Sequence, residues 1–555
     1  MSAYEGRLEL TWTNKTLRLL ANDEGGYEWV APADYRVAEV RLLDEVVAIG
    51  QAGRTRAKDN LLIRGDALNA LRSLSRLPEF AQEYLGRVML AYLDPPFNTQ
   101  QAFAHYDDAL EHSVWLTMIR DRLLQVRELL APDGSVWVHC DDEEQHRLRL
   151  VMDEVFGPNC YVATIIWRSS DNSNNDAKHF STDHNYLVVY AASAEWKSER
   201  LEPNPEQVAH FANPDNDPRG PWFDGNPLNS PNPRENLRYS VVSPQGVNIE
   251  SPPNGWRWSR DTLDEKIRDG EIRFTPDGTN LRRRTYLLDH KGLPASSLWV
   301  DLQETGHNRQ AKAELKRLFP GSATSDLFAT PKPERLMRRI LRVATRPGDI
   351  VVDCFVGSGT TAAVAHKMGR RWVAIEREAD TIENFARPRL TKVVSGEDSG
   401  GVTALAGWIG GGGFRVLEVA PSMFAADAGQ VFLADWVTNG KLAEATAAQL
   451  GYEYHPESPF SGSRGRTRLA VIDGVVNAAV VRLVVGALGD GQRVVVCGTG
   501  IDTEARPILR ELRPGSTLRK IPAALLDEYR SARQLRLKAD EPVRAESPAM
   551  TEVTE

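Results

Sequence analysis

Residues 350–376 read IVVDCFVGSGTTAAVAHKMGRRWVAIE, which predicts a strand, a glycine loop, a helix and a second strand in immediate succession. Apolar runs separated by helical periods are typical of a parallel α/β sheet. Glycines in the loop allow positive φ and close approach of the backbone to a ligand. The second strand ends at Glu376, where a carboxylate is well placed to bind ribose hydroxyls. The loop matches neither GxGxxG nor the lysine-containing phosphate loop, so it does not indicate phosphate binding.

The same alternation of strand-like and helical patterns begins at Asn60, and it is found on both sides of a long irregular segment. The expected strands are LLIRG (61–65), VMLAYLD (88–94), SVWVHC (135–140) and YLVVYAA (186–192), and helices are expected over about 113–130 and 143–156. From about Arg200 to Leu298 the residues Pro, Gly, Asn, Arg and Trp dominate instead. This stretch is too long for one loop in a compact domain, so we expect an inserted domain with some β structure.

These changes in composition and periodicity divide the chain into six segments. We expect a β-containing N-terminal extension (1–59), the first part of an α/β domain (60–198), an insertion (199–324), the second part of the α/β domain (325–394), a C-terminal α/β domain (395–536) and a disordered tail (537–555). Within the extension, the alternating runs Leu8–Trp12 and Arg36–Leu42 predict strands. The Ser/Gly/Asp-rich residues 395–401 read as a linker.

Composition excludes several classes of protein. No stretch is long and apolar enough to predict a spanning helix, and the first residues lack the pattern of a signal peptide. The four scattered cysteines predict neither a disulfide framework nor a metal site, so we expect a cytoplasmic protein without bound metal. The net charge of −9 disfavours a protein that coats DNA without sequence preference. It does not exclude a large enzyme that binds nucleic acid in one local groove.

A second motif, Asp94-Pro95-Pro96-Phe97, directly follows a predicted strand. The carboxylate and the proline carbonyls are acceptors, and the ring is a flat stacking surface. Together they suit a planar ring that carries an exocyclic amino group. Taken alone, the motif is also compatible with a simple turn in which Asp94 caps a helix.

Together the two motifs resemble those of S-adenosylmethionine-dependent DNA amino-methyltransferases, with DPPF as the catalytic motif and DCFVGSGTT (353–361) as the cofactor loop. The catalytic motif precedes the cofactor loop, which is the order of the β class of adenine-N6 methyltransferases. The elements IRGDAL (63–68) and FATPKP (328–333) are similar to two further elements of that class. Residues 217–258 and 411–416 resemble the modification subunits of type III restriction systems. Two departures are Phe97 where tyrosine is commoner, and Cys354 where proline is usual.

The resemblance implies a Rossmann-like class I methyltransferase sheet in circularly permuted order. Segment 199–324 would then be the target-recognition domain, and segment 395–536 would serve dimerisation or partner docking. The implied reaction methylates N6 of an adenine extruded from duplex DNA. Asp94 and the carbonyl of Pro95 would accept the two amino hydrogens, with Pro96 completing the turn, and Phe97 would stack on the base.

The cofactor-binding residues are also implied by the resemblance. Glu376 would bind the ribose hydroxyls and Asp66 the adenine end, with the N-cap of a helix as the alternative for Asp66. Thr330 and Lys332 would lie at the methionine end, although Lys332 could also be a solvated charge. The loop itself would contribute Asp353, Phe355, Gly357, Ser358, Gly359 and Thr360.

Clusters of arginine are the sequence feature that suggests contacts with DNA. Candidate phosphate-binding arginines are Arg335, Arg338, Arg339, Arg342 and Arg346 on one predicted helix, Arg282–Arg284 in the insertion, and Arg464, Arg466 and Arg468. Each cluster could equally be a solvated surface. The resemblance implies double-stranded DNA as substrate, a homodimer, and a restriction or helicase subunit as partner. Alternatives are a cytosine-N4 methyltransferase, an RNA or protein-glutamine methyltransferase, and a non-catalytic DNA-binding subunit.

Overall fold

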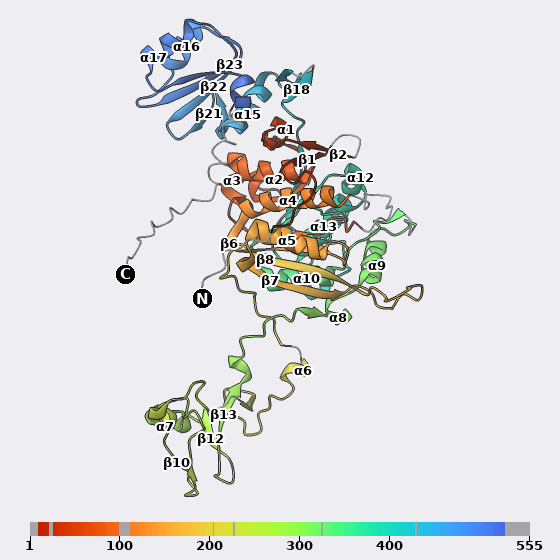
Figure 1. Cartoon of the computed structure of the whole chain (residues 1–555), viewed down its shortest axis with the longest axis vertical. Helices are drawn as coiled ribbons and strands as arrows, with labels where there is room; N and C mark the ends of the chain where they lie inside the picture. The colour runs from red at the N-terminus through yellow and green to blue at the C-terminus, as the bar shows by residue number, and fades with distance from the viewer. Residues whose placement is uncertain are drawn as a thin grey trace, which may run out of the picture. The chain divides into compact units, whose positions relative to one another are not determined.

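The computed structural model describes residues 9–21, 26–98, 111–203, 205–225, 228–323, 326–427 and 430–527 (Figure 1). They fall into two compact units. The first combines the described residues up to Lys197 with those from Ser296 onward, and the second is Ser198–Ala295.

The first unit is built on a ten-stranded sheet in the order β14-β7-β8-β6-β5-β15-β16-β4-β17-β3. In that order the strands are Leu298–Trp299, Tyr161–Arg168, His184–Ala191, Leu130–Cys140, Val88–Leu93, Ile350–Asp353, Arg371–Glu376, Asn60–Arg64, Gly413–Val419 and Leu43–Gly50. The six strands from β6 to β17 are parallel to one another. Strands β8 and β3 run antiparallel to their neighbours. The predicted α/β class is confirmed.

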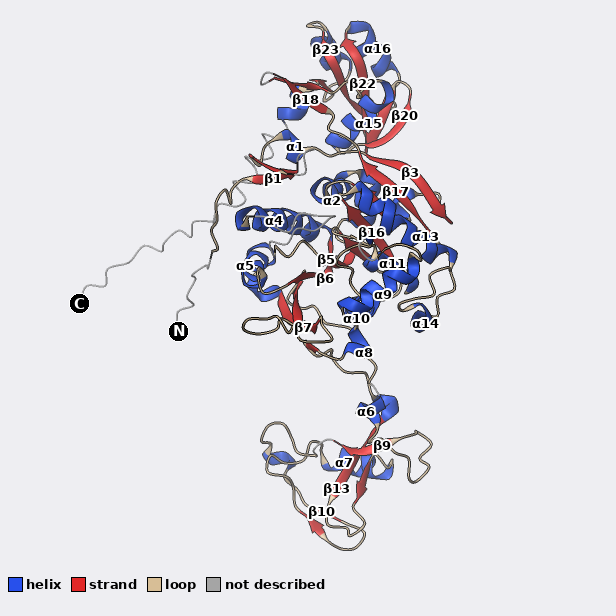
Figure 2. Ribbon diagram, turned by 90° about the vertical axis from the view of Figure 1, so that its right-hand side faces the viewer, coloured by secondary structure: helices blue, strands red, loops and turns tan. Residues whose placement is uncertain are grey.

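Helices cover both faces of this sheet, which explains why its central strands are continuous apolar runs. Figure 2 shows α4 and α5 on one side of the strands and α10 and α11 on the other. Between β4 and β17 the helices of the first unit are α2 (Ala67–Arg76), α3 (Pro78–Tyr84), α4 (His112–Leu129), α5 (Gln145–Phe156), α8 (Leu302–Thr305), α9 (Asn308–Leu318), α10 (Glu334–Ala344), α11 (Thr360–Lys367), α12 (Ala379–Thr381), α13 (Arg387–Ser395) and α14 (Thr403–Ala406). Across the described residues, none of the helices has the length and apolar character needed to span a bilayer.

The permuted chain order places the two motifs side by side. From β5 the chain passes through α4 to β6 on one side, and from β15 it passes through α11 to β16 on the other. Strands β5 and β15 are paired in parallel, with Asp353 opposite Tyr92. Their carboxyl ends therefore form the point at which the winding of the sheet reverses, where open α/β sheets bind ligands.

The N-terminal extension differs from the prediction. Its hairpin is β1 (Arg18–Ala21) with β2 (Tyr27–Val30), and neither Arg36–Leu42 nor residues 9–12 form a strand. Asp34 caps the short helix α1 (Tyr35–Ala38) by accepting from the backbone N–H of Arg36, which starts a helix where the alternation predicted a strand. The indole of Trp12 donates to Thr117 on α4, so this segment packs instead of pairing. Leu8 lies outside the described residues.

The C-terminal region contributes to three sheets, of which β18 and β19 form a two-stranded one. Strand β17, which lies beyond the expected linker, pairs in parallel with β4 in the central sheet. Strands β20–β24 form a separate five-stranded sheet. The elements after β17 are β18 (Phe424–Asp427), β19 (Gln430–Leu433), α15 (Asn439–Leu450), β20 (Glu453–Glu457), β21 (Phe460–Arg464), β22 (Thr467–Val476), α16 (Ala478–Gly486), β23 (Arg493–Ile501), α17 (Ala505–Leu512) and β24 (Thr517–Lys520).

The second unit is small and largely irregular. It contains α6 (Pro205–Val208), β9 (Trp222–Gly225), β10 (Val241–Val242), β11 (Asn248–Ile249), α7 (Arg260–Arg268), β12 (Ile272–Phe274) and β13 (Leu281–Tyr286). Buried apolar residues such as Trp256, Leu263 and Leu281 form its core. Residues 296–318, placed in the insertion by the sequence, pack in the first unit because β14 pairs with β7 there.

Candidate active site at the carboxyl ends of β5 and β15

A cavity of about 420 Å³ opens at the switch point of the sheet, entirely within the first unit. Both sequence motifs line it. The predicted site residues around it are Asp66, Asp94, Pro95, Pro96, Phe97, Thr330, Lys332, Asp353, Phe355, Gly357, Ser358, Thr360 and Glu376. Residues separated by more than 300 positions in the chain thus meet in one place.

The carboxylate of Asp94 is paired with Lys332. The Lys332 ammonium donates to Oδ1 at 2.8 Å and to Oδ2 at 2.6 Å, and its Nζ lies 4.9 Å from the centroid of the Phe97 ring. The two side chains are 16% and 9% exposed. Burial raises the pKa of Asp94, and the charge of Lys332 opposes that rise. Lys332, predicted from the sequence to lie at the methionine end of the cofactor site, therefore contacts the carboxylate of Asp94.

The Phe97 ring is supported from behind by a buried histidine. Its centroid lies 5.3 Å from that of His139, with the planes 28° apart. Burial holds the pKa of His139 well below its ordinary value, so this ring is neutral. The hydroxyl of Tyr92 lies 3.0 Å from Nδ1 of His139 and fixes its orientation. A neutral stack of this kind holds Phe97 without adding charge to the cavity.

Hydrogen bonds fix the turn that follows β5. The indole N–H of Trp115 donates to the carbonyl of Pro96 at 2.7 Å. Asn98 adopts a positive φ of 64° and donates to the buried carboxylate of Glu144 at 2.8 Å. The DPPF segment is therefore held in one conformation from both sides.

The glycine loop is tied to the end of β16. Glu376 accepts from the backbone N–H of Gly357 at 2.9 Å and from those of Arg377 and Glu378 at 2.9 and 3.1 Å. Gly357 has φ of 49°, and a Cβ there would lie 2.8 Å from the ring of Phe328. Only glycine fits this position. Burial raises the pKa of Glu376.

Other predicted cofactor residues have structural partners as well. Asp353 accepts from the N–H of Phe355 at 3.0 Å, and burial raises the pKa of its carboxyl to about 7. Asp66 caps α2 by accepting from the N–H of Leu68 at 2.7 Å and also lines the cavity, and its contact with the cofactor stays a prediction. Gly359 starts α11 with φ of 83° and does not line the cavity.

Several residues that line the cavity belong to no motif from which the sequence could have predicted them. Polar side chains that share the cavity with Phe97 are Ser169, Thr182, Asn185 and Asn308, and further members are Tyr27, Arg122 and Arg377. Asn308 begins α9, in a stretch that the sequence placed in the insertion. Tyr27 comes from the N-terminal hairpin. Only the folded chain brings these residues to the site.

Many of the arginines considered for DNA binding are engaged within the chain. Pairs formed by these arginines are Arg335 with the carbonyl of Gln303, Arg339 with Glu304, Arg283 with Glu271, Arg284 with Asp215 and Asp217, and Arg464 with the carbonyl of Leu450. Trp222 and Trp256 are buried in the second unit. These side chains stabilise their surroundings, and individual DNA contacts stay predictions.

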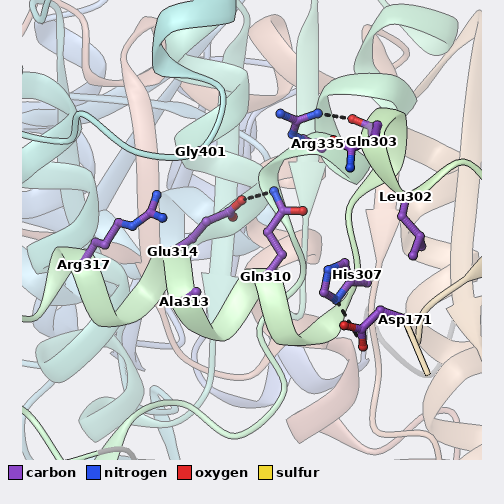
Figure 3. A pocket seen from close by; sticks show the side chains of 10 residues that line it. All are labelled: Asp171, Leu302, Gln303, His307, Gln310, Ala313, Glu314, Arg317, Arg335 and Gly401. Atoms are coloured by element: carbon purple, nitrogen blue, oxygen red, sulfur yellow. Dashed lines mark hydrogen bonds and ion pairs between the residues drawn. The ribbon is translucent and has the colours of Figure 1, made fainter. Parts of the chain in front are cut away.

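A second cavity of about 560 Å³ lies beside α8, α9 and the start of α10 (Figure 3). Its polar side chains face one another: Gln310 donates to Glu314 at 3.0 Å, and Nδ1 of His307 lies 3.8 Å from Asp171. The ten described residues that line it include none of the predicted site residues except Arg335, a candidate for DNA binding. The chemistry indicated by the sequence therefore belongs to the first cavity.

The fold and the motifs at its switch point define a class I methyltransferase. The chain belongs to the N6_N4 DNA methylase family, whose model matches residues 88–387. It is 29% identical over 427 residues to a type III restriction-modification enzyme HindVI Mod subunit from Haemophilus influenzae, covering 65% of this chain and 54% of that protein. It is 26% identical over 389 residues to the StyLTI Mod subunit from Salmonella typhimurium, covering 60% and 57%.

A solved structure with similar features is a DNA modification methylase from Thermus thermophilus, in complex with S-adenosyl-L-methionine. It matches with a TM-score of 0.32 and 14% identity over 65% of this chain and 100% of that one. The chain spans somewhat more than half the length of the curated relatives that it matches. The predicted resemblance to DNA amino-methyltransferases and to type III Mod subunits is confirmed.

Proposed function

We propose that the chain transfers a methyl group from S-adenosylmethionine to N6 of an adenine extruded from duplex DNA. The observation that carries this proposal is the Asp94–Phe97 segment, which presents a buried carboxylate and a supported aromatic ring to one cavity. Family membership covers both N6 and N4 amino groups. Adenine is preferred because the motif has aspartate, where cytosine-N4 enzymes more often have serine, and because the order of the motifs is that of the β class.

The residues around the glycine loop fit the cofactor. The carboxylate of Glu376 is oriented by three backbone N–H groups at the edge of the cavity, which leaves about one of its lone-pair sites to accept from a ribose hydroxyl. Gly357 lets the backbone approach the ligand closely, and Phe355 and Thr330 line the adjoining wall. When bound, the cofactor supplies an electrophilic methyl group.

The chain's own residues then orient the amine. Ionised Asp94 accepts one N–H of the exocyclic amino group and the carbonyl of Pro95 accepts the other, which directs the nitrogen lone pair at the methyl carbon. Phe97 stacks on the base. As the N–C bond forms and the C–S bond breaks, the nitrogen loses one proton, and Asp94 accepts it. A carboxyl whose pKa is raised by burial is the stronger base for this step.

The setting of this reaction is inferred from the relatives. Two of them are Mod subunits of type III restriction-modification enzymes, so we place this chain in a phage-defence system with a separate restriction subunit. We propose that it works as a homodimer in the cytoplasm, with the region after Val419 available for dimerisation or docking. The second unit, Ser198–Ala295, is proposed to recognise the target sequence.

The choice of base is tested in living cells. The chain is expressed in a bacterial host that lacks DNA methylation, and the nucleosides of its DNA are resolved by mass spectrometry. N6-methyldeoxyadenosine is the expected product, and long-read sequencing of the same DNA then gives the recognition site. N4-methyldeoxycytidine would reverse the choice of base.

The cofactor loop provides a prediction with a matched control. Gly357→Ala is expected to weaken S-adenosylmethionine binding roughly 10-fold or more, because a positive φ strains alanine by about 1–2 kcal/mol and the new methyl group meets Phe328. Gly369 has a positive φ of 71° but nothing within 4 Å of an added Cβ. Gly369→Ala therefore carries the backbone strain alone and should retain affinity. Isothermal calorimetry measures both, and equal affinities in the two variants would refute this role of Gly357.

A further inference from the structure

The ion pair between Lys332 and Asp94 lies where the proposed reaction takes place. Both carboxylate oxygens accept from the same ammonium group, which also sits over the face of Phe97. An amino group of a stacked base must donate to the same carboxylate beside the same ring. The Lys332 ammonium therefore occupies the position of the hydrogen-bond donor that the proposed reaction brings to Asp94.

The other groups that face Asp94 leave it without compensating charge. His139, 4.0 Å away, is neutral because burial lowers its pKa. Burial and nearby carboxylates raise the pKa values of Tyr92 and of the Cys140 thiol, so neither is charged near neutral pH. Asp353 adds negative charge when ionised. Among the described residues, Lys332 is thus the one cation within hydrogen-bonding distance of this carboxylate.

We propose that Lys332 is a positioning residue that keeps Asp94 ionised and in place until the target amino group replaces one of its two hydrogen bonds. This inference rests on the proposed function. A carboxylate has about four lone-pair sites, so Lys332 can stay on one oxygen while the base donates to the other. A protonated Asp94 keeps one oxygen that can accept a hydrogen bond, but it cannot take up the proton that the amine releases.

The direction of the pH effect follows from the charges. Burial raises the pKa of Asp94 and Lys332 lowers it, so removing the ammonium raises it further. Methyl transfer needs ionised Asp94 and is lost as the pH falls through this pKa. Lys332→Met replaces the ammonium with an unbranched apolar side chain one atom shorter, and because the charge is lost it should shift the acid limb of the pH–rate profile to higher pH.

The experiment measures transfer of labelled methyl to unmethylated genomic DNA from about pH 5.5 to 9.5 for the wild-type protein, Lys332→Met and Lys332→Arg. We expect the acid limb of Lys332→Met to move up by roughly one unit or more, with a loss of about 10-fold or more below the wild-type limb that is largely recovered at pH 9. Lys332→Arg keeps the charge and should keep the limb near that of the wild type. Burial raises the pKa of Asp353 to about 7, so Asp353→Asn, alone and combined with Lys332→Met, removes this second carboxyl, and a limb shift that persists without it belongs to Asp94.

Two further readouts separate the possible outcomes. Cofactor affinity of Lys332→Met, measured by calorimetry at pH 9, should stay within about threefold of wild type. In infrared spectra at pH 7, Lys332→Met should show the band of a protonated carboxyl group that disappears when Asp94→Asn is added. A rate lowered equally at all pH values, or a lost cofactor affinity with an unmoved limb, would overturn the role of Lys332. Absence of transfer by the wild-type protein would instead refute the proposed function, and the infrared band would still decide the charge state of Asp94.

Discussion

Asp94→Ala is expected to reduce methyl transfer by about 10³-fold or more while cofactor affinity stays within about threefold. The substitution removes the acceptor of the amino hydrogen and of the released proton, and the carbonyl of Pro95 cannot orient the amine alone. The described contacts of the glycine loop with Glu376 do not involve Asp94, so the cofactor should still bind. Initial rates with labelled cofactor measure the first effect, and calorimetry measures the second.

Asp142 provides the matched control. It follows β6, the strand beside β5, and its exposed carboxylate accepts from the hydroxyl of Tyr186 at 2.7 Å. Asp142→Ala removes a carboxylate two residues beyond the end of a parallel strand without touching the cavity, so its rate should remain close to wild type. A near-normal rate for Asp94→Ala would remove Asp94 from the mechanism.

Glu334→Ala is expected to destabilise the first unit by about 3–5 kcal/mol. The side chain of Glu334 is about 1% exposed, and its carboxylate accepts from Lys367 at 2.8 and 2.9 Å and from Arg389 at 2.8 Å. Removing it leaves two buried cations with one carboxylate, Asp398, which pairs with Lys367 at 2.6 Å. The midpoint of urea unfolding, followed by circular dichroism, measures the loss.

An exposed ion pair serves as the control for this prediction. Glu383 and Arg387 pair one turn apart near the start of α13, with side chains 40% and 35% exposed. Glu383→Ala should change the free energy of unfolding by less than about 1 kcal/mol, because solvent screens such pairs. Equal effects of Glu334→Ala and Glu383→Ala would show that the buried cluster contributes no special stability.

The buried cluster also connects separate parts of the site. Arg389 donates to Thr360 in the glycine loop at 2.8 Å as well as to Glu334, which lies two residues after Lys332. The N–H of Val402 donates to Glu334 at 2.9 Å. Residues 395–401, which the sequence predicted to be a linker, therefore lead into a buried ionic contact. Loss of Glu334 should weaken cofactor binding along with stability.

The motifs were predictable because they depend on short stretches of sequence. An apolar strand followed by Asp94, or by the glycines after Asp353, has a local signature, and the α/β sheet follows from several such strands. Their adjacency in space follows from the winding of a parallel sheet. For this reason the class of fold and the position of the cavity could be predicted from the sequence.

The partner of Lys332 was not predictable in the same way. It pairs with a residue 238 positions earlier in the chain, and nothing in FATPKP distinguishes an ion pair with Asp94 from a contact with the cofactor. Strand β17 pairs with β4 and β3 in the central sheet. This pairing joins residues that are far apart in the sequence, so no local pattern predicted it. Around Arg36 the helix-capping side chain of Asp34 outweighed the alternating pattern.

The most direct measurement is transfer of labelled methyl from S-adenosylmethionine to unmethylated DNA by the purified chain, compared with Asp94→Ala under the same conditions. The proposed function predicts label in N6-methyldeoxyadenosine for the wild-type protein and background for the variant. Absence of label in DNA from a folded wild-type protein that binds the cofactor would contradict the proposal that this chain alone is a DNA adenine methyltransferase.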